Sequence, residues 1–357
     1  MTWREVGAEE AVSLAQAGAT VIDVREDAEW RAGHVARAVH VPLGEVADRV
    51  PGLVPDREAP VLVYCAVGVR SAHAAEWLSR AGYSSVASLR APLDDWRRAG
   101  GGWTAEPSLL DEHARRRYAR QIPIPEVGEE GQRRLLDARV LLIGAGGLGS
   151  PVALYLAAAG VGTIGLVDDD VVDASNLQRQ VVHTTDRIGL AKTESAERTL
   201  AGLNPDVRVI RHEERMVAAN VDALIAGYDV IVDGSDNLET RYLLNDAMLR
   251  ARVPVVHGSV YRWDGQVTTF LPFEGPCYRC LHPEPPPPEL APACEVAGVM
   301  GVLPGIVGLL QATEALKLLL GAGRSLSGRL LMVDALEARF EEVAFARDPG
   351  CPACGGG

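Results

Sequence analysis

The chain has 357 residues, 47% of them hydrophobic, and a formal net charge of −13 at pH 7. This length exceeds what one hydrophobic core comfortably organises, so we expect two domains. The acidic balance disfavours nucleic acid as a partner, and the absence of a long uninterrupted apolar run disfavours a membrane-spanning helix. No secretory leader is evident, so we expect a reducing, cytoplasmic environment.

The first hundred residues place one cysteine in a position suited to sulfur chemistry. Residues 60–64 read as a buried strand that leads directly into Cys65, and residues 71–81 read as the helix that follows. A cysteine between a strand end and a helix N-terminus lies in a cradle of backbone N–H groups, which stabilises thiolate or persulfide charge. We therefore expect the pKa of Cys65 to lie below that of a free thiol.

The DVRE block that starts at Asp23, the GH pair at residues 33–34 and the CxxGxRS block together resemble a single rhodanese domain, which we expect over residues 1–104. Four residues separate Cys65 from Arg70, one fewer than in phosphatases with a similar loop, and the tighter ring suits a terminal sulfur atom. Arg70 would hold the loop or neutralise a persulfide, whereas Asp23 and Arg25 would build the framework. A catalytically inactive docking domain is the alternative.

Residues 99–108 are rich in glycine and read as a linker, and residues 109–121 read as a charged helix that opens a second domain over residues 105–357. There, a strand at 139–143, a glycine-rich turn, a helix at 149–159 and a strand at 163–167 follow one another, as in a Rossmann-like doubly wound α/β fold. The glycines allow a phosphate to approach the backbone, and a carboxylate at the end of the second strand suits a ribose hydroxyl. These cofactor-binding residues are Gly144, Gly146, Gly147, Gly149 and Asp168.

Those features alone also fit a nicotinamide-dependent dehydrogenase, but the polar residues that follow favour ATP. Asn176, Arg179 and Lys192 come after the second strand, and nucleotidyl transfer must stabilise charge on the α-phosphate and pyrophosphate. Asp236 follows a further strand at 228–233 and is placed to hold magnesium. The alternative is that Asp236 and its neighbour only cap the helix expected at 238–251.

Two cysteine pairs predict a structural zinc site. Cys277 and Cys280 form one CxxC pair, and Cys351 and Cys354 form the other. Four thiolates fit tetrahedral Zn²⁺ and leave no open position for chemistry, so the metal would tie the C-terminal segment back onto the domain. Free or disulfide-bonded cysteines are the alternative, which a reducing environment disfavours.

Residues 115–357 resemble the MoeB/ThiF adenylyltransferases, relatives of ubiquitin-activating enzymes. The matching blocks are RYARQ from Arg117, GAGGLGSP from Gly144, DDDVVDASNLQRQ from Asp168, Lys192, SDN, CYRC, the Cys294 segment and the final CPAC. The resemblance implies that Asp168 binds ribose, that Asn176, Arg179 and Lys192 bind phosphates, and that Asp236 supports magnesium. It also implies a homodimer in which Arg120 reaches the ATP of the neighbouring subunit.

The sequence leaves the roles of three segments toward the C-terminus open. Cys294 follows a proline-rich stretch expected to be an exposed loop, and relatives place a reactive cysteine there. It would attack an acyl adenylate or receive sulfur, or else be a small apolar filler. Residues 265–270 alternate like a half-exposed strand that could take a partner peptide, and residues 303–320 read as a buried helix or dimer contact.

Both domains together predict ATP-dependent adenylation of the C-terminal glycine of a small ubiquitin-like sulfur-carrier protein. A persulfide on Cys65, loaded from a persulfide or thiosulfate donor, would then give the carrier thiocarboxylate. The catalytic set would be Cys65, Arg70, Cys294, Arg179, Lys192 and Arg120, with ATP, Mg²⁺ and structural Zn²⁺. Two alternatives remain: an activator for protein conjugation through a Cys294 thioester, with the rhodanese domain only docking, and a nucleotide-binding scaffold without activity. We expect neither nucleic acid nor a membrane as a partner.

Overall fold

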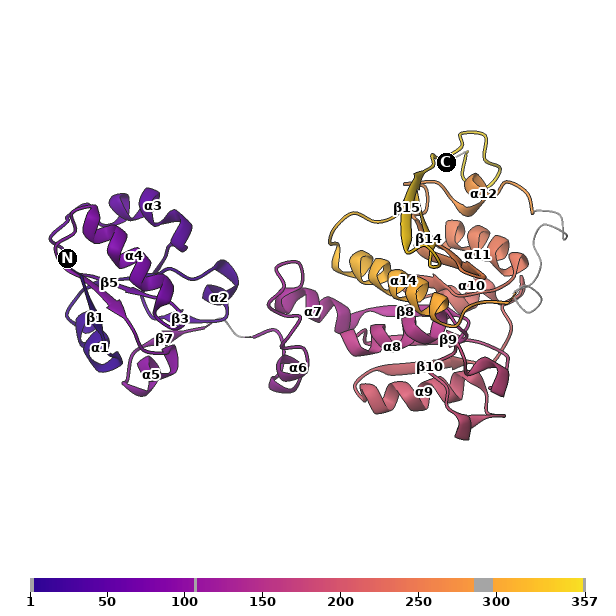
Figure 1. The fold of residues 1–357 in the computed structure, drawn as a ribbon, viewed down its shortest axis with the longest axis horizontal. Coiled ribbons are helices and arrows are strands. Elements are labelled where there is room, and N and C mark those ends of the chain that lie inside the picture. The colour runs from indigo at the N-terminus through magenta and orange to yellow at the C-terminus, as the bar shows by residue number, and fades with distance from the viewer. Residues whose placement is uncertain (1–2, 106–107, 286–297, 356–357) are drawn as a thin grey trace. The chain divides into compact units, whose positions relative to one another are not determined.

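The computed structural model describes residues 3–105, 108–285 and 298–355, and it divides into two compact units, Met1–Ala114 and Arg115–Gly357 (Figure 1). The first unit is built on a parallel sheet with the strand order β1-β6-β5-β2-β4. Its strands are β1 (Trp3–Val6), β2 (Thr20–Asp23), β4 (Val39–His40), β5 (Val61–Tyr64) and β6 (Val86–Leu89).

Helices cover both faces of this sheet, as the continuous apolar strands require. One core contains buried side chains of α3 (Val46–Leu53) and α4 (Val69–Arg80), and the other contains those of α1 (Ala8–Gln16) and α5 (Leu93–Arg98). The short helix α2 (Asp27–Arg31) follows β2. This architecture places the end of β5, and hence Cys65, at the N-terminus of α4.

The glycine-rich stretch predicted as a linker belongs in part to the first unit. β7 (Trp103–Thr104) pairs with β3 (His34–Val35), and the Gly102 carbonyl accepts a hydrogen bond from the Ala36 N–H at 3.0 Å. A Cβ on Gly101 would lie 2.3 Å from the Trp96 ring. These glycines therefore allow close packing, and the linker prediction is wrong for residues 99–104.

The second unit has an eight-stranded sheet with the order β10-β9-β8-β11-β12-β13-β14-β15, of which the first five strands are parallel. The strand order reverses between β8 and β11, and such a switch point is where open α/β sheets bind ligands. The strands are β8 (Arg139–Ile143), β9 (Thr163–Val167), β10 (Arg208–His212), β11 (Val230–Asp233), β12 (Val255–Tyr261), β13 (Asp264–Phe270), β14 (Arg329–Asp334) and β15 (Arg339–Ala344).

Two helical layers cover this sheet. Buried residues of α8 (Gly149–Ala159), α9 (Lys192–Leu203) and α14 (Val302–Leu320) share one core, and those of α10 (Val221–Ile225) and α11 (Leu238–Ala251) share the other. Helix α7 (Gly128–Asp137) packs on α14, and α12 (Tyr278–Leu281) packs on α11. The charged helix predicted at 109–121 is shorter in the structure, where α6 spans Glu112–Arg117.

Helix α14 has 19 residues and is apolar enough, by length and composition, to cross a membrane. In the structure it packs against strands β11, β12 and β13 and against α8, beside which it lies in Figure 1. Leu303, Val307, Ala312 and Ala315 are buried in these contacts. A core helix of this kind has the composition of a membrane span without needing a membrane, and the predicted burial of this segment is confirmed.

The prediction of a half-exposed, partner-binding strand at 265–270 is wrong. β13 lies between β12 and β14, and its residues from Val267 to Phe270 are buried. Its two threonine hydroxyls donate to internal acceptors: Thr268 to the Arg329 carbonyl at 2.9 Å and Thr269 to Glu314 at 3.0 Å. The alternation of polar and apolar residues therefore reflects hydrogen bonding inside the fold.

Candidate active sites

A cavity of about 740 Å³ opens at the carboxyl ends of β8, β9 and β11 in the second unit. It brings together residues that lie up to 161 positions apart in the sequence (143 to 304). Most of the predicted ATP-binding residues line it, namely Gly144, Gly146, Gly147, Asp168, Asn176, Arg179, Lys192 and Asp236. The cavity therefore has a glycine turn on one wall and both cationic and acidic side chains on the others.

Gly149 does not line the cavity, and its role is close packing. It begins α8, and a Cβ there would lie 2.0 Å from the Gly144 carbonyl oxygen. Gly144 itself has φ +92°, and its Cβ would meet the Gly234 carbonyl oxygen at 3.1 Å. Glycine at both positions lets the turn fold back on the helix and approach the loop after β11.

Asp168 fastens the end of β9 to the glycine turn. Its Oδ2 accepts a hydrogen bond from the Ala145 N–H at 2.8 Å, and its Oδ1 accepts one from the Asp170 N–H at 2.9 Å. Burial raises the pKa of Asp168 above its usual range, although the charge of Lys192 opposes this effect. The carboxylate is thus held rigidly at the cavity wall.

The cations of the cavity differ in their partners. The Lys192 Nζ forms an ion pair with the Asp170 Oδ2 at 2.7 Å, and the lysine side chain is 8% exposed while the aspartate is 67% exposed. Arg179 has no carboxylate partner in the described part of the chain and donates to the Ser175 carbonyl at 3.1 Å. Arg179 is therefore available to an anion as it stands, whereas Lys192 must share or leave Asp170.

His183 links the glycine turn to the helix that starts with Lys192, and the sequence analysis missed it. Its Nε2 lies 3.0 Å from the Ala145 carbonyl oxygen, and its Nδ1 lies 2.9 Å from the Ser195 Oγ on α9. A carbonyl only accepts, so the proton is on Nε2 and Ser195 donates to Nδ1. Burial lowers the pKa of His183, which keeps the ring neutral. Only tertiary contact, and no local pattern, identifies this residue.

The two polar residues after Ser235 have different contacts. Asn237 caps α11, because its side chain accepts a hydrogen bond from the Thr240 N–H at 2.9 Å. Asp236 is exposed, makes no capping bond and lines the cavity. Arg215 and Arg241 also line it, and neither was predicted from sequence.

The four predicted zinc ligands lie together. The Sγ···Sγ distances are 3.8 Å for Cys277–Cys280, 3.7 Å for Cys277–Cys351 and 3.4 Å for Cys280–Cys354. A tetrahedral ion with Zn–S bonds of about 2.3 Å separates its sulfur ligands by about 3.8 Å. All four sulfur atoms lie within 4.8 Å of one another, so the donor set fits structural Zn²⁺.

In the first unit, Cys65 lies at the bottom of a tight loop. Its Sγ accepts a hydrogen bond from the Gly68 N–H at 3.1 Å and lies 3.6 Å from the Ser71 Oγ. Gly68 has φ +94°, and a Cβ there would meet the backbone of Arg90 at 3.2 Å, so the loop requires glycine. Burial alone would raise the pKa of Cys65, but hydrogen bonds from Ser71, Val67 and Gly68 outweigh it, and the pKa is lowered.

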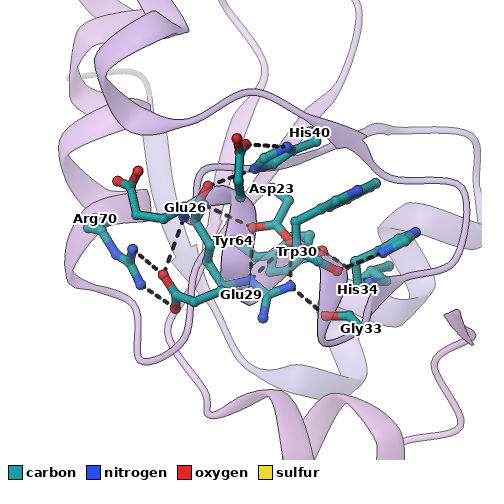
Figure 2. A network of polar contacts seen from close by, with 12 residues as sticks. Asp23, Glu26, Glu29, Trp30, Gly33, His34, His40, Tyr64 and Arg70 are labelled. Carbon is teal, nitrogen blue, oxygen red and sulfur yellow. Dashed lines mark hydrogen bonds and ion pairs between the residues drawn. The ribbon is translucent and has the colours of Figure 1, made fainter. Parts of the chain in front are cut away.

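Arg70 does not point its charge at Cys65 in the structure. Its two terminal nitrogens each lie 2.7 Å from an oxygen of Glu29, so it ties α4 to α2 (Figure 2). Behind this pair, Arg25 forms a buried ion pair with Asp23 at 2.6 Å, and the Tyr64 hydroxyl donates to Asp23 at 2.6 Å. Arg70 is thus a clamp on the loop in this state.

Two predicted site residues lie outside both sites as described. Arg120 is exposed in the turn after α6 and does not line the cavity of its own chain. Cys294 lies outside the described residues, so its contacts are not part of the structure. The geometry thus comprises a nucleotide-sized cavity, a four-cysteine site and a separate thiol cradle.

Comparison with known families decides what these sites belong to. The ThiF family model matches residues 118–353, and the model of the rhodanese-like domain matches residues 7–99. The chain belongs to the ThiF family. Its N-terminal unit carries the rhodanese-like domain, so both predicted families and the predicted fold class are confirmed.

Three relatives are about half identical to this chain over 248 to 258 aligned residues. The "SAMP-activating enzyme E1" of Haloferax volcanii is 55% identical over 248 residues, covering 70% of this chain and 92% of that protein. The "Sulfur carrier protein adenylyltransferase" of Thermus thermophilus is 52% identical over 258 residues, covering 71% and 93%. The "Probable adenylyltransferase/sulfurtransferase MoeZ" of Mycobacterium tuberculosis is 49% identical over 249 residues, covering 69% of this chain and 64% of that protein.

Among solved structures, Escherichia coli MccB with AMPCPP and MccA aligns with a TM-score of 0.61 at 20% identity, covering 74% of this chain and 82% of that one. At this identity the likeness shows the fold alone. The ThiF-family relatives identify the chain as an enzyme, an adenylyltransferase joined to a sulfurtransferase. They also imply that the chain uses ATP, and the dehydrogenase alternative is wrong.

Proposed function

We propose that the second unit uses Mg-ATP to adenylate the C-terminal glycine of a small ubiquitin-like sulfur-carrier protein, and that the Cys65 persulfide then supplies sulfur for the carrier thiocarboxylate. The observation that carries the adenylation is the cavity in which a glycine turn, Arg179, Lys192 and Asp236 converge. The carrier as substrate is supported by the names of two relatives, one SAMP-activating and one acting on a sulfur carrier protein.

In the first step, an oxygen of the carrier carboxylate attacks the α-phosphorus and pyrophosphate leaves. The carboxylate is already ionised, so no side chain is needed as a base, and charge stabilisation dominates. Arg179, Lys192 and Asp168 line the cavity. The two cations would bind the phosphates, and Asp168 would bind the ribose. Asp236 would hold Mg²⁺, which would neutralise phosphate charge.

In the second step, the terminal sulfur of the Cys65 persulfide attacks the carbonyl carbon of the acyl adenylate, and AMP leaves. A thiol then attacks the Cys65 sulfur, releasing the thiocarboxylate and forming a disulfide that further thiol exchange reduces. Cys294 is our candidate for this thiol within the chain. The lowered pKa of Cys65 supports its loading, because the thiolate is the form that accepts sulfur from a persulfide or thiosulfate donor.

We also propose a homodimer. Arg120 is exposed and does not line the cavity of its own chain, which suits a residue that a second subunit supplies. An arginine added in this way would stabilise charge on the transferring phosphoryl group.

Intact-mass analysis of a Gly-Gly-ending carrier tests the proposal. After incubation with the full chain, Mg-ATP and thiosulfate, the carrier should exchange one oxygen for sulfur. With Cys65→Ala it should gain only AMP. An AMP adduct that never gains sulfur with the wild type would remove the sulfurtransferase step. If lysine-linked carrier conjugates form without Cys65, the chain is an activator for protein conjugation and not a sulfurtransferase.

A further inference from the structure

The loop that carries Asp236 into the nucleotide cavity rests on a fully buried carboxylate. The Asp233 Oδ1 accepts hydrogen bonds from the Ser235 N–H at 3.0 Å and from the Ser235 hydroxyl at 2.6 Å. Its Oδ2 accepts one from the His257 Nδ1–H on β12 at 2.7 Å. A buried carboxylate destabilises a fold unless it accepts hydrogen bonds. Here the bonds from Ser235 also fix the first residues after β11.

Arg241 lies behind the same loop, on the first turn of α11. Its Nη2 donates to the Ser235 carbonyl at 3.0 Å, so Ser235 is held at both its carbonyl and its N–H. No carboxylate lies within ion-pair distance of Arg241 in the described part of the chain, and its buried Nε has no hydrogen-bond partner there. An arginine kept in such a place indicates a role other than a surface ion pair.

A small cavity of about 10 Å³ lies beside Arg241 and Tyr278. Asp233, Arg241, Asn245, His257 and Tyr278 line it together with apolar residues. Its volume is about that of one water-sized sphere, and its polar lining suits a bound water better than an empty space. The charge of Arg241 therefore faces the same polar space as the buried Asp233–His257 pair.

Tyr278 lines this small cavity and is the neighbour of the metal-ligand residue Cys277. It stands next to Cys277 at the start of α12, and its N–H donates to the Asn245 side chain of α11 at 2.8 Å. Its ring packs edge-on against His257, with 5.3 Å between ring centroids. The metal-ligating segment is thus attached both to the helix that carries Arg241 and to the partner of Asp233.

We infer that Arg241 is a positioning residue for the Ser235–Asn237 loop, and that the four-cysteine site holds Arg241 in place through Tyr278. The inference rests on the proposed adenylation, since it makes the zinc site a support for the magnesium-bearing side of the nucleotide cavity. The glycine turn packs on Gly234 of this segment, but its Ala145 is hydrogen-bonded to Asp168 and His183, which do not belong to this support.

The test measures nucleotide binding by the full chain without any carrier. Calorimetry gives the Kd of the non-hydrolysable α,β-methylene analogue of ATP, with magnesium and in magnesium-free buffer. Arg241→Gln should raise the Kd about ten-fold more with magnesium than without it, because Arg241 lines the cavity in both conditions but only the magnesium complex needs the Asp236 loop. Arg241→Lys keeps the charge, so its Kd should lie between those of the wild type and Arg241→Gln. It replaces the glutamine variant in the test if that variant does not fold. Arg250→Gln is the matched control, since Arg250 lies on the same helix and pairs with exposed Asp222.

A second arm removes zinc with a chelator that does not bind magnesium. Zinc loss, confirmed by metal analysis, should raise the magnesium-dependent Kd of the wild type but cause no further rise in Arg241→Gln. Equal losses of analogue affinity with and without magnesium would overturn the inference. Additive effects of zinc loss and Arg241→Gln on the Kd would also overturn it. A wild type that binds no analogue under either condition would overturn the proposed adenylation, and this inference with it.

Discussion

At the scale of single residues, the reactivity of Cys65 depends on two buried hydroxyl groups. The Ser88 hydroxyl donates to the Ser71 hydroxyl at 3.0 Å, and Ser71 lies 3.6 Å from the Cys65 Sγ. In the described contacts Ser71 donates to the Gly68 carbonyl at 3.0 Å. A thiolate is a stronger acceptor than a carbonyl, so ionisation of Cys65 would turn this proton toward the sulfur. Arg70 adds positive charge nearby, although Glu29 neutralises most of it.

Ser71→Ala should therefore raise the pKa of Cys65, because burial, which raises it, remains, while the side-chain hydrogen bond of Ser71 is lost and only the backbone hydrogen bonds still lower it. The thiolate fraction at pH 7 falls, and alkylation of Cys65 should slow by about ten-fold. The measurement is the pH dependence of iodoacetamide labelling, followed on the Cys65 peptide by mass spectrometry. Ser84→Ala is the control, since the Ser84 hydroxyl only meets the Arg57 carbonyl. An unchanged pH midpoint in Ser71→Ala would contradict this account.

At the scale of elements, the glycine turn and α8 form one unit that tolerates no side chain at Gly149. Gly149→Ala would bring a Cβ within 2.0 Å of the Gly144 carbonyl, and that contact is backbone and cannot yield easily. We expect a loss of about 2 kcal/mol in the free energy of unfolding and at least a ten-fold weaker ATP affinity. Gly202→Ala on α9 meets nothing within 4 Å and should be neutral or slightly stabilising. Urea unfolding and ATP titration of both variants distinguish the two outcomes.

Helix α14 is attached to the segment before β14 by one buried carboxylate. Glu314 accepts hydrogen bonds from the Leu326 N–H at 2.7 Å and from the Thr269 hydroxyl, and it pairs with Lys317. Glu314→Ala leaves these donors without a partner and should cost about 3 kcal/mol. Glu314→Gln keeps an acceptor and should cost clearly less. If the two variants unfold at the same urea concentration, the carboxylate is not what joins these elements.

Elements whose signals are local were predictable to the residue. The strands at 139–143 and 163–167 and the helices at 149–159 and 238–251 match β8, β9, α8 and α11, because apolar runs and flanking glycine or polar caps mark their ends. The eight cavity-lining residues predicted from sequence follow strand ends in the same way. The exposure of β13 was predicted wrongly because the hydroxyls of Thr268 and Thr269 bond acceptors on β14 and α14 and not water. His183 and His257 were missed because their partners lie in other segments of the fold, and Arg241 because its partner is the backbone carbonyl of Ser235, which no side-chain pattern marks.

At the scale of the whole molecule, the two compact units should respond separately to metal loss. The cysteine site lies within Arg115–Gly357 and joins two CxxC pairs that are 71 positions apart in the chain. Closing a chain loop of this length is worth about 4 kcal/mol, so zinc removal should lower the melting temperature of this unit by about 10 °C. The first unit contains no described ligand of that site and should melt unchanged. Differential scanning calorimetry with and without zinc would show one transition moving, and a shift of both would contradict independent units.

Helix α14 also has a consequence for how the chain is made. Most elements on which α14 packs, namely α7, α8, β11, β12 and β13, come earlier in the sequence, although Leu303 and Val307 also share a core with Val333 of β14. A ribosome therefore releases most of the receiving surface before it releases this apolar helix, and domains fold progressively from the N-terminal side during synthesis. The one described segment that a membrane-insertion machinery would recognise by composition meets its folded partner as soon as it emerges. The strands β14 and β15, which complete the edge of the sheet, and the second CxxC pair at Cys351 and Cys354 follow α14 in the chain.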